Sequence, residues 1–96
     1  MASVRRLVLD VLKPHDPPLV DFTDQLSRVA GVAGATCVLV ELDREVQNVE
    51  VTLEGEGLDL GTVEETIDGL GGTVHSVDLV ACGDRLVTPR RSVHDA

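Results

Sequence analysis

The sequence predicts one α+β domain with elements in the order β-α-β-β-α-β, and three observations support this prediction. The chain has 96 residues, which suits a single hydrophobic core. Four segments have the apolar pattern of strands, and two have the 3, 4, 3 apolar spacing of an amphipathic helix. The two helical patterns repeat at an offset of 41 residues. Two β-α-β halves give the ferredoxin-like fold, a four-stranded antiparallel sheet with two helices on one face.

The first half contains a strand, a helix and a second strand. The strand spans residues 4–13, and the side chains expected to face the helices are Leu7, Leu9 and Val11. Asp16 predicts a helix N-cap, with Pro17 at the first helical position. The apolar positions of this helix are Leu19, Phe22, Leu26 and Val29. Gly31 predicts the end of the helix, and residues 36–43 predict the next strand.

The second half repeats this pattern. Residues 46–54 predict a strand that follows a tight turn, and Asp59 predicts the cap of a second helix. The apolar positions of that helix are Leu60, Val63, Ile67 and Leu70. Gly71 and Gly72 predict its end, and residues 73–82 predict the last strand. The domain is expected over residues 1–84, with a flexible C-terminal tail over residues 85–96.

The usual strand order of this fold, 4-1-3-2, decides the state of the two cysteines. Cys37 lies on the second strand and Cys82 at the end of the fourth, so they occupy opposite edges of the sheet. Three strand spacings separate them by about 14 Å. That distance excludes a disulfide within one chain.

The charge balance bears on partners and location. The chain has 17 acidic against 8 basic residues and a net charge of −9, which disfavours binding to nucleic acid. Acid excess with a single lysine, Lys13, predicts a salt-rich cytoplasm and a halophilic source. We expect a cytoplasmic protein without signal peptide or membrane association, because no apolar run approaches the length of a membrane span.

Because both helices cover one face of the sheet, the other face is open to water, a ligand or a second subunit. The side chains predicted on this open face are Val8, Asp10, Leu12, Leu39, Glu41, Asp43, Asn48, Glu50, Thr52, Glu54, Ser76, Asp78 and Val80. Those predicted to be buried on the two outer strands are Val38, Val40, Leu42, Val77 and Leu79. Mixed apolar and charged residues are typical of an interface, so we expect a homo-oligomer formed through the sheet face or edge strands.

Three carboxylates on the open face form the candidate site. Antiparallel register places Asp10 beside Asn48 or Glu50 on one neighbouring strand and beside Ser76 or Asp78 on the other. Adjacent carboxylates repel unless a cation, a proton or an arginine joins them. Oxygen ligands suit Ca²⁺ or Mg²⁺, so Asp10, Glu50 and Asp78 are the predicted metal ligands. Two alternatives stay open: a solvated acidic face in a very acidic chain, and neutralisation by Arg6.

The sequence gives little support for catalysis. His75 and Ser76 are neighbours on a strand and should point to opposite faces, which argues against a His-Ser-Asp relay with Asp78. Two glutamates flank the helix start after Gly55 and would repel a phosphate. His15 is expected to be a solvated loop residue. We therefore expect a protein that is not an enzyme and has no organic cofactor.

Three segments resemble an archaeal family known as domain of unknown function 211. They are LVLDVLKPHDP at residues 7–17, LDREVQNVEVTLEG at 42–55 and GGTVHSVDLV at 71–80. The resemblance implies a ferredoxin-like fold, homo-oligomeric assembly and no assigned enzymatic activity. It also implies binding of divalent cations, with Ca²⁺ as the first candidate. Leu79 follows Asp78 where the family tends to have an acid, which removes one possible ligand.

The functional hypothesis is a homo-oligomer that binds divalent cations on its open face or at subunit interfaces. The alternative is a regulatory domain that senses a small organic effector at a subunit interface, near the first strand and the loop of residues 14–18. Amino-acid-binding regulatory domains of the same topology use that region.

Overall fold

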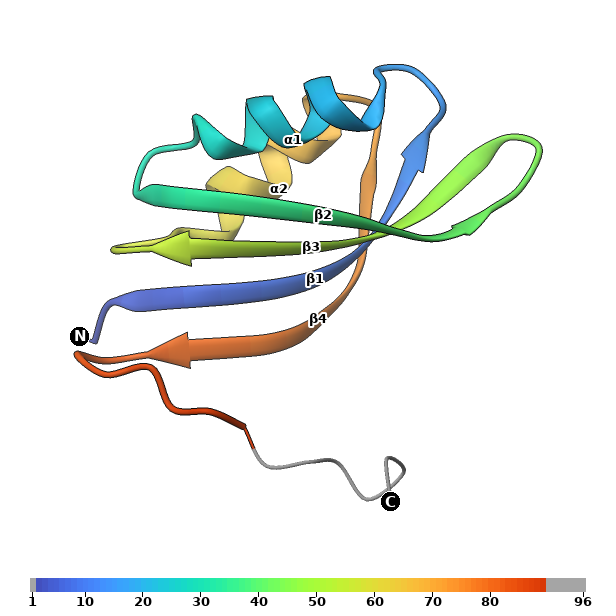
Figure 1. The fold of residues 1–96 in the computed structure, drawn as a ribbon. Coiled ribbons are helices and arrows are strands. Elements are labelled where there is room, and N and C mark those ends of the chain that lie inside the picture. Colours follow the sequence, from blue (N-terminus) through green and yellow to red (C-terminus); the bar gives the residue numbers. More distant parts are fainter. Residues whose placement is uncertain (1, 90–96) are drawn as a thin grey trace.

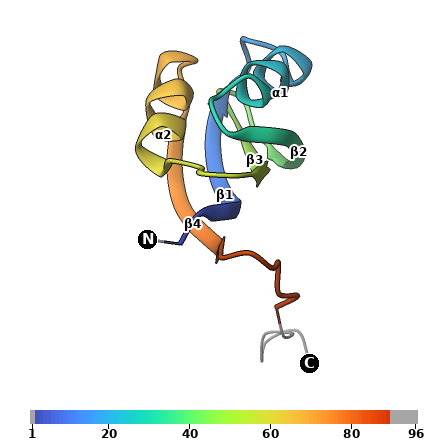
Figure 2. The same cartoon turned by 90° about the vertical axis from the view of Figure 1, so that its left-hand side faces the viewer.

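Residues 2–89 of the chain are described by a computed structural model, and they form six elements in the predicted order. The elements are β1 (Val4–Pro14), α1 (Leu19–Ser27), β2 (Val32–Leu42), β3 (Val46–Gly55), α2 (Leu60–Gly69) and β4 (Thr73–Cys82). The strands form one antiparallel sheet in the order β2-β3-β1-β4, with both helices on the same face (Figure 1). In Figure 2, α2 lies on the β4 side and α1 on the β2 side. The predicted fold is therefore confirmed.

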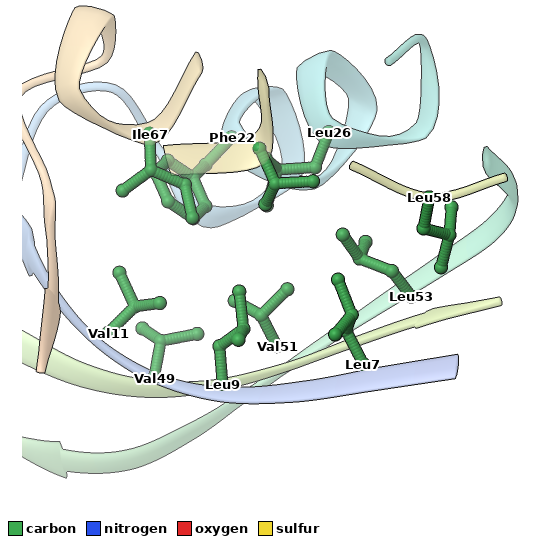
Figure 3. Close-up of a cluster of buried hydrophobic side chains, with 11 residues drawn as sticks. Leu7, Leu9, Val11, Phe22, Leu26, Val49, Val51, Leu53, Leu58 and Ile67 are labelled. Carbon is green, nitrogen blue, oxygen red and sulfur yellow. The ribbon is translucent and has the colours of Figure 1, made fainter. Parts of the chain in front are cut away.

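The hydrophobic core lies between the two central strands and the two helices. Alternate residues of β1 and β3 point toward Phe22, Leu26 and Ile67 of the helices (Figure 3). The core residues of the two strands are Leu7, Leu9, Val11, Val49, Val51 and Leu53. These are the positions that the period-2 pattern predicts, because each apolar residue is followed by one that points to the open face.

The helices are related by the predicted offset, although their starts differ. Phe22 and Leu26 of α1 correspond to the buried Val63 and Ile67 of α2. Asp59 caps α2 as expected, since its carboxylate accepts hydrogen bonds from Gly61 N and Thr62 Oγ1.

The predicted start of α1 at Asp16 and Pro17 is wrong. Pro18 occupies the N-cap position, no side chain caps the helix, and the Asp16–Pro17 peptide bond is cis. The end of α1 also differs from the prediction, because its C-cap is Arg28 and Gly31 lies in the turn before β2.

The outer strands depart from the predicted inward and outward faces. On β2, Val38 pairs with Glu50 and therefore lies on the open face, whereas Leu39 pairs with the buried Val49. Val40 is the extra residue of a bulge, and it is exposed, as is Leu42. The prediction that Val38, Val40 and Leu42 are buried is thus wrong.

Bulges also change the faces of β4. The extra residues are His75 and Asp78, which lie opposite no residue of β1. As a result, Val80 pairs with Leu7 on the helix face, and Leu79 pairs with Val8 on the open face. The sequence predicted the reverse for both residues, because a strict alternation leaves no room for a bulge.

The cysteines lie on opposite edge strands, as predicted, and both are free thiols. The part of the predicted tail that the structure describes, residues 85–89, has no helix or strand. It leaves the sheet from the end of β4 (Figure 1). The remainder of the predicted tail, residues 90–96, lies outside the described residues.

Candidate functional site

The centre of the open face holds two directly opposed carboxylates. Asp10 of β1 is the cross-strand partner of Glu50 of β3, one of the two pairings that the sequence predicted. Side chains that are direct partners in an antiparallel sheet have Cβ atoms about 4.5–5.5 Å apart. Asp10 is half-buried and Glu50 is exposed. The two carboxylates can therefore reach a common ligand from adjacent strands.

The third predicted ligand, Asp78, lies on the other side of Asp10. Ser76 of β4 is the cross-strand partner of Asp10, and its hydroxyl donates a hydrogen bond of 2.7 Å to Asp78 Oδ1. Asp78 itself is a bulge residue and is exposed. Ser76 thus lies opposite Asp10, and its hydroxyl already satisfies one carboxylate oxygen of Asp78.

Arg6 lies on the open face but binds a different carboxylate. Its guanidinium donates from Nε to Glu54 Oε2 at 2.9 Å, and Nη2 lies 2.8 Å from the same oxygen. Arg6 and Glu54 are cross-strand partners, so the pair is fixed by the register of β1 and β3. Within residues 2–89, the ion pairs are Arg6–Glu54 and Arg28–Asp24, and neither includes Asp10 or Glu50.

The surroundings of the carboxylates are partly apolar. Val8 and Leu12 flank Asp10 along β1, and Val38 lies opposite Glu50 on β2. Among the described residues, no cluster of three or more His, Cys, Asp or Glu side chains is arranged to hold a metal ion. The open face therefore presents an opposed carboxylate pair with Asp78 nearby, and the three-carboxylate site stays a prediction.

Lys13, the only lysine, has a role that the sequence analysis missed. Its side chain is 0% exposed, and its Nζ donates hydrogen bonds to Pro14 O at 2.8 Å and Gln47 Oε1 at 3.0 Å. The ammonium group also lies 5.7 Å from the centroid of the Phe22 ring, within cation–π range. Burial lowers the pKa of Lys13 below its ordinary value, although the nearby Asp16 acts in the opposite direction. The alternation of β1 contained the signal, because position 13 follows 7, 9 and 11 on the helix face.

His15 contacts the β2–β3 turn and so is more than a solvated loop residue. Its Nε2 lies 2.9 Å from the carbonyl oxygen of Asp43, so Nε2 must carry the proton and donate. The Asp43 carboxylate accepts hydrogen bonds from the backbone N–H groups of Glu45 and Val46. These bonds hold the pKa of Asp43 below its usual range. His15 therefore joins the β1–α1 loop to the tip of the hairpin.

A groove of about 570 Å³ lies between α1 and the outer strand β2. Its lining is mainly small and apolar and includes Leu19, Val20, Thr23, Ala35 and Cys37. Burial raises the pKa of the Cys37 thiol, partly offset by a hydrogen bond with Thr23. The groove begins beside the residue 14–18 loop, where the sequence placed the alternative effector site.

The fold and the open face define a small ferredoxin-like protein with a bare, partly acidic sheet surface and exposed edge strands. A family model for domain of unknown function 211, described as "Uncharacterized ArCR", matches residues 5–96. The chain is also similar to the uncharacterized protein MJ0319 of Methanocaldococcus jannaschii, with 40% identity over 95 residues. That alignment covers 99% of this chain and 98% of the relative. The chain therefore belongs to the archaeal domain of unknown function 211 family.

The two helices, α1 and α2, also bear on the prediction of no membrane association. None of those within residues 2–89 is long and apolar enough to cross a membrane.

Proposed function

We propose that this protein is a non-enzymatic homo-oligomer that binds a divalent cation, Ca²⁺ first and Mg²⁺ second, on the open sheet face. The observation that carries the proposal is the direct opposition of Asp10 and Glu50, with the basic side chain on the same face, Arg6, bound to Glu54. Two carboxylates on directly opposed residues of adjacent strands repel, and a cation between them removes this cost.

The composition of the site favours a hard cation. Carboxylate and hydroxyl oxygens are the side-chain donors around Asp10, and such ligands suit Ca²⁺ and Mg²⁺ better than zinc. Asp78 completes the proposed ligand set if its side chain turns from Ser76 toward Asp10. Ca²⁺ takes six to eight oxygen ligands. The rest of the shell would come from water.

The absence of catalysis is also part of the proposal. The hydroxyl of Ser76 donates to Asp78, so it is engaged with an acid rather than with the ring of His75. His75 is exposed on a bulge. This arrangement supports a binding role for the segment. Residence in a salt-rich cytoplasm belongs to the same proposal and rests on the 17 acidic against 8 basic residues.

Asp10→Asn should abolish most of the rise in melting temperature that Ca²⁺ produces in the parent protein. Without divalent cations the same variant should be slightly more stable, by about 0.2–1 kcal/mol, because the repulsion with Glu50 is removed. The measurement is a thermal-shift titration with Ca²⁺ and Mg²⁺, with Glu65→Gln on the exposed surface of α2 as a charge-matched control. An identical Ca²⁺ response in the parent and Asp10→Asn would contradict the cation site.

The mass of the protein in solution tests whether the chain forms an oligomer. Light scattering of the parent protein across protein and salt concentrations should give at least twice the 10.2 kDa of the single chain. Salt should favour the assembly, because it screens the repulsion between chains that each carry a net charge of −9. A monomer at every salt concentration would rule out the oligomer.

A second candidate function is favoured by the groove between α1 and β2. Its volume of about 570 Å³ is in the range of small-molecule pockets. Its lining combines apolar side chains with the polar Thr23 and Ser27. A small-ligand sensor would bind an organic effector there. The same thermal-shift assay distinguishes the two functions, because an organic effector would stabilise a sensor and divalent ions would stabilise a cation-binding protein.

A further inference from the structure

We propose that two copies of this chain join through β2, with the two β2 strands antiparallel across a two-fold axis, to form a continuous eight-stranded sheet. This inference rests on the proposed homo-oligomer and names the surface that forms it. It also names the partner, which is a second copy of the same chain.

The outer edge of β2 is free and regular. Within residues 2–89, β2 pairs with β3 alone, so its other edge presents unpaired backbone N–H and C=O groups. The pairing of β2 with β3 runs without a bulge from Gly34 to Leu39. Natural edge strands are usually protected from such pairing by lysine, proline, charged residues or bulges. Between Gly34 and Leu39, β2 has none of these.

Charge favours β2 over the other edge strand. Residues 29–40 contain no charged side chain, although the whole chain has a net charge of −9. Two identical acidic chains repel least where their facing surfaces are neutral. The groove beside β2 contains one acid, Asp24, which is paired with Arg28. The β4 edge differs, because bulges at His75 and Asp78 interrupt it and a groove lined by Glu64 and Asp68 of α2 adjoins it. A strand from a second copy therefore fits β2 better than β4.

Exposed apolar side chains concentrate around the same edge. The exposed large apolar residues of this region are Val20, Val38, Leu39, Val40 and Leu42. Val20 of α1 is 78% exposed and lines the groove between α1 and β2. In an antiparallel β2 pair, the two α1 helices lie on the same face of the joined sheet, on either side of the two-fold axis. The partner's α1 would then cover Val20 and the groove.

The two-fold arrangement gives a complete assembly with only two copies of the chain. Pairing of β2 with β2 uses the same surface on both chains, so no edge that resembles β2 stays free. Pairing of β2 with β4 of the next chain would use two different surfaces and would continue to a ring or a filament. The neutral, bulge-free run from Gly34 to Leu39 in β2, against the two bulges and the acid in the middle of β4, favours the closed pair.

The test compares lysine substitutions on the two edge strands. Val38 of β2 is 50% exposed and Val80 of β4 is 53% exposed, so Val38→Lys and Val80→Lys are matched in exposure and in charge change. Val38→Lys should raise the dissociation constant of the dimer at least tenfold, measured by light scattering over a dilution series. Val80→Lys should leave it unchanged. Circular dichroism checks that both variants fold, and Thr36→Lys is a second β2 variant that is not opposite Glu50.

Each outcome has a distinct meaning. Dissociation by both Val38→Lys and Val80→Lys would overturn the two-fold pair in favour of β2-to-β4 contacts. Retention of the assembly in Val38→Lys and Thr36→Lys would overturn the β2 surface while the proposed homo-oligomer stands. A parent protein that is monomeric under all conditions would overturn the oligomer and, with it, this inference.

Discussion

Lys13→Ala should lower the free energy of unfolding by about 3 kcal/mol, within the range for truncation of a long buried side chain. The lysine stem is fully buried in the core beside Phe22, so truncation leaves a cavity there. Pro14 O and Gln47 Oε1 also lose their donor. Urea denaturation followed by circular dichroism measures the difference.

Lys13→Met is the matched control. Methionine fills nearly the same volume without the ammonium group, and replacement of a buried charge by an apolar residue of similar size is often neutral or stabilising. We expect a change of less than about 1.5 kcal/mol, the limit for swaps that conserve volume. If Lys13→Met is as unstable as Lys13→Ala, the charge and its hydrogen bonds matter more than the packing of the stem.

The parent protein and Lys13→Met also show how the burial of Lys13 makes the free energy of unfolding depend on pH. The folded-state pKa of Lys13 is lowered, so the unfolded chain binds more protons between the lowered pKa and the ordinary lysine value of about 10.4. Stability of the parent relative to Lys13→Met should therefore rise with pH across that window. The Lys13 charge also lowers the pKa of the Cys37 thiol, so Cys37→Ala is introduced into both proteins to remove that titration from the comparison. If the difference in the free energy of unfolding between the parent and Lys13→Met is constant with pH, burial does not perturb the pKa of Lys13.

Gly55→Ala should also lower the free energy of unfolding by about 3 kcal/mol, the upper end of the range for overpacking. A Cβ at position 55 would collide with the carbonyl oxygen of Gly31 and press on the backbone of Ala33. Backbone cannot rotate away as a flexible side chain can. The Glu56 N–H also donates to Gly31 O, so the end of β3 and the start of β2 are tightly joined at this point. Chemical denaturation of the variant checks the loss.

Gly34→Ala is the control for this close approach. Gly34 lies in the neighbouring strand, and a Cβ there meets no atom within 4 Å. The substitution should be neutral or slightly stabilising, because alanine loses less conformational freedom on folding than glycine. Equal losses in the two variants would show that the contact with Gly31 is not the cause.

The segment LDVLKPH shows how structure divides a motif that looks like one functional unit. Leu9 and Val11 are core residues, Lys13 is buried against Phe22, and His15 binds the hairpin turn. Asp10 is the member of the segment whose carboxylate faces Glu50 on the open side. Most residues of this segment therefore stabilise the fold, and Asp10 is the one residue of the segment that the proposed cation site uses.

The usual strand order of the fold class supplied the sheet order, and the predicted register left Asn48 and Glu50 as alternative partners of Asp10. The sequence by itself determined the element order and the core positions of β1, β3 and the helices. These follow from periodicities of 2 and 3.6 residues and from an internal repeat, which are local properties of the chain. It could not determine the faces of the outer strands. In CVLVEL of β2 apolar residues fall on both faces, and the bulge at Val40 is set by pairing with β3. The bulges at His75 and Asp78 likewise arise from pairing with β1.

Tertiary structure also decided the surroundings of Lys13 and Arg6. The burial of a lysine depends on which partners meet it, here Gln47 from β3 and Phe22 from α1. The choice of Glu54 over Asp10 by Arg6 depends on the register of β1 against β3. The alternation of β1 predicts that Lys13 faces the helices, but the partners of Lys13 and Arg6 depend on how elements distant in the sequence pack together.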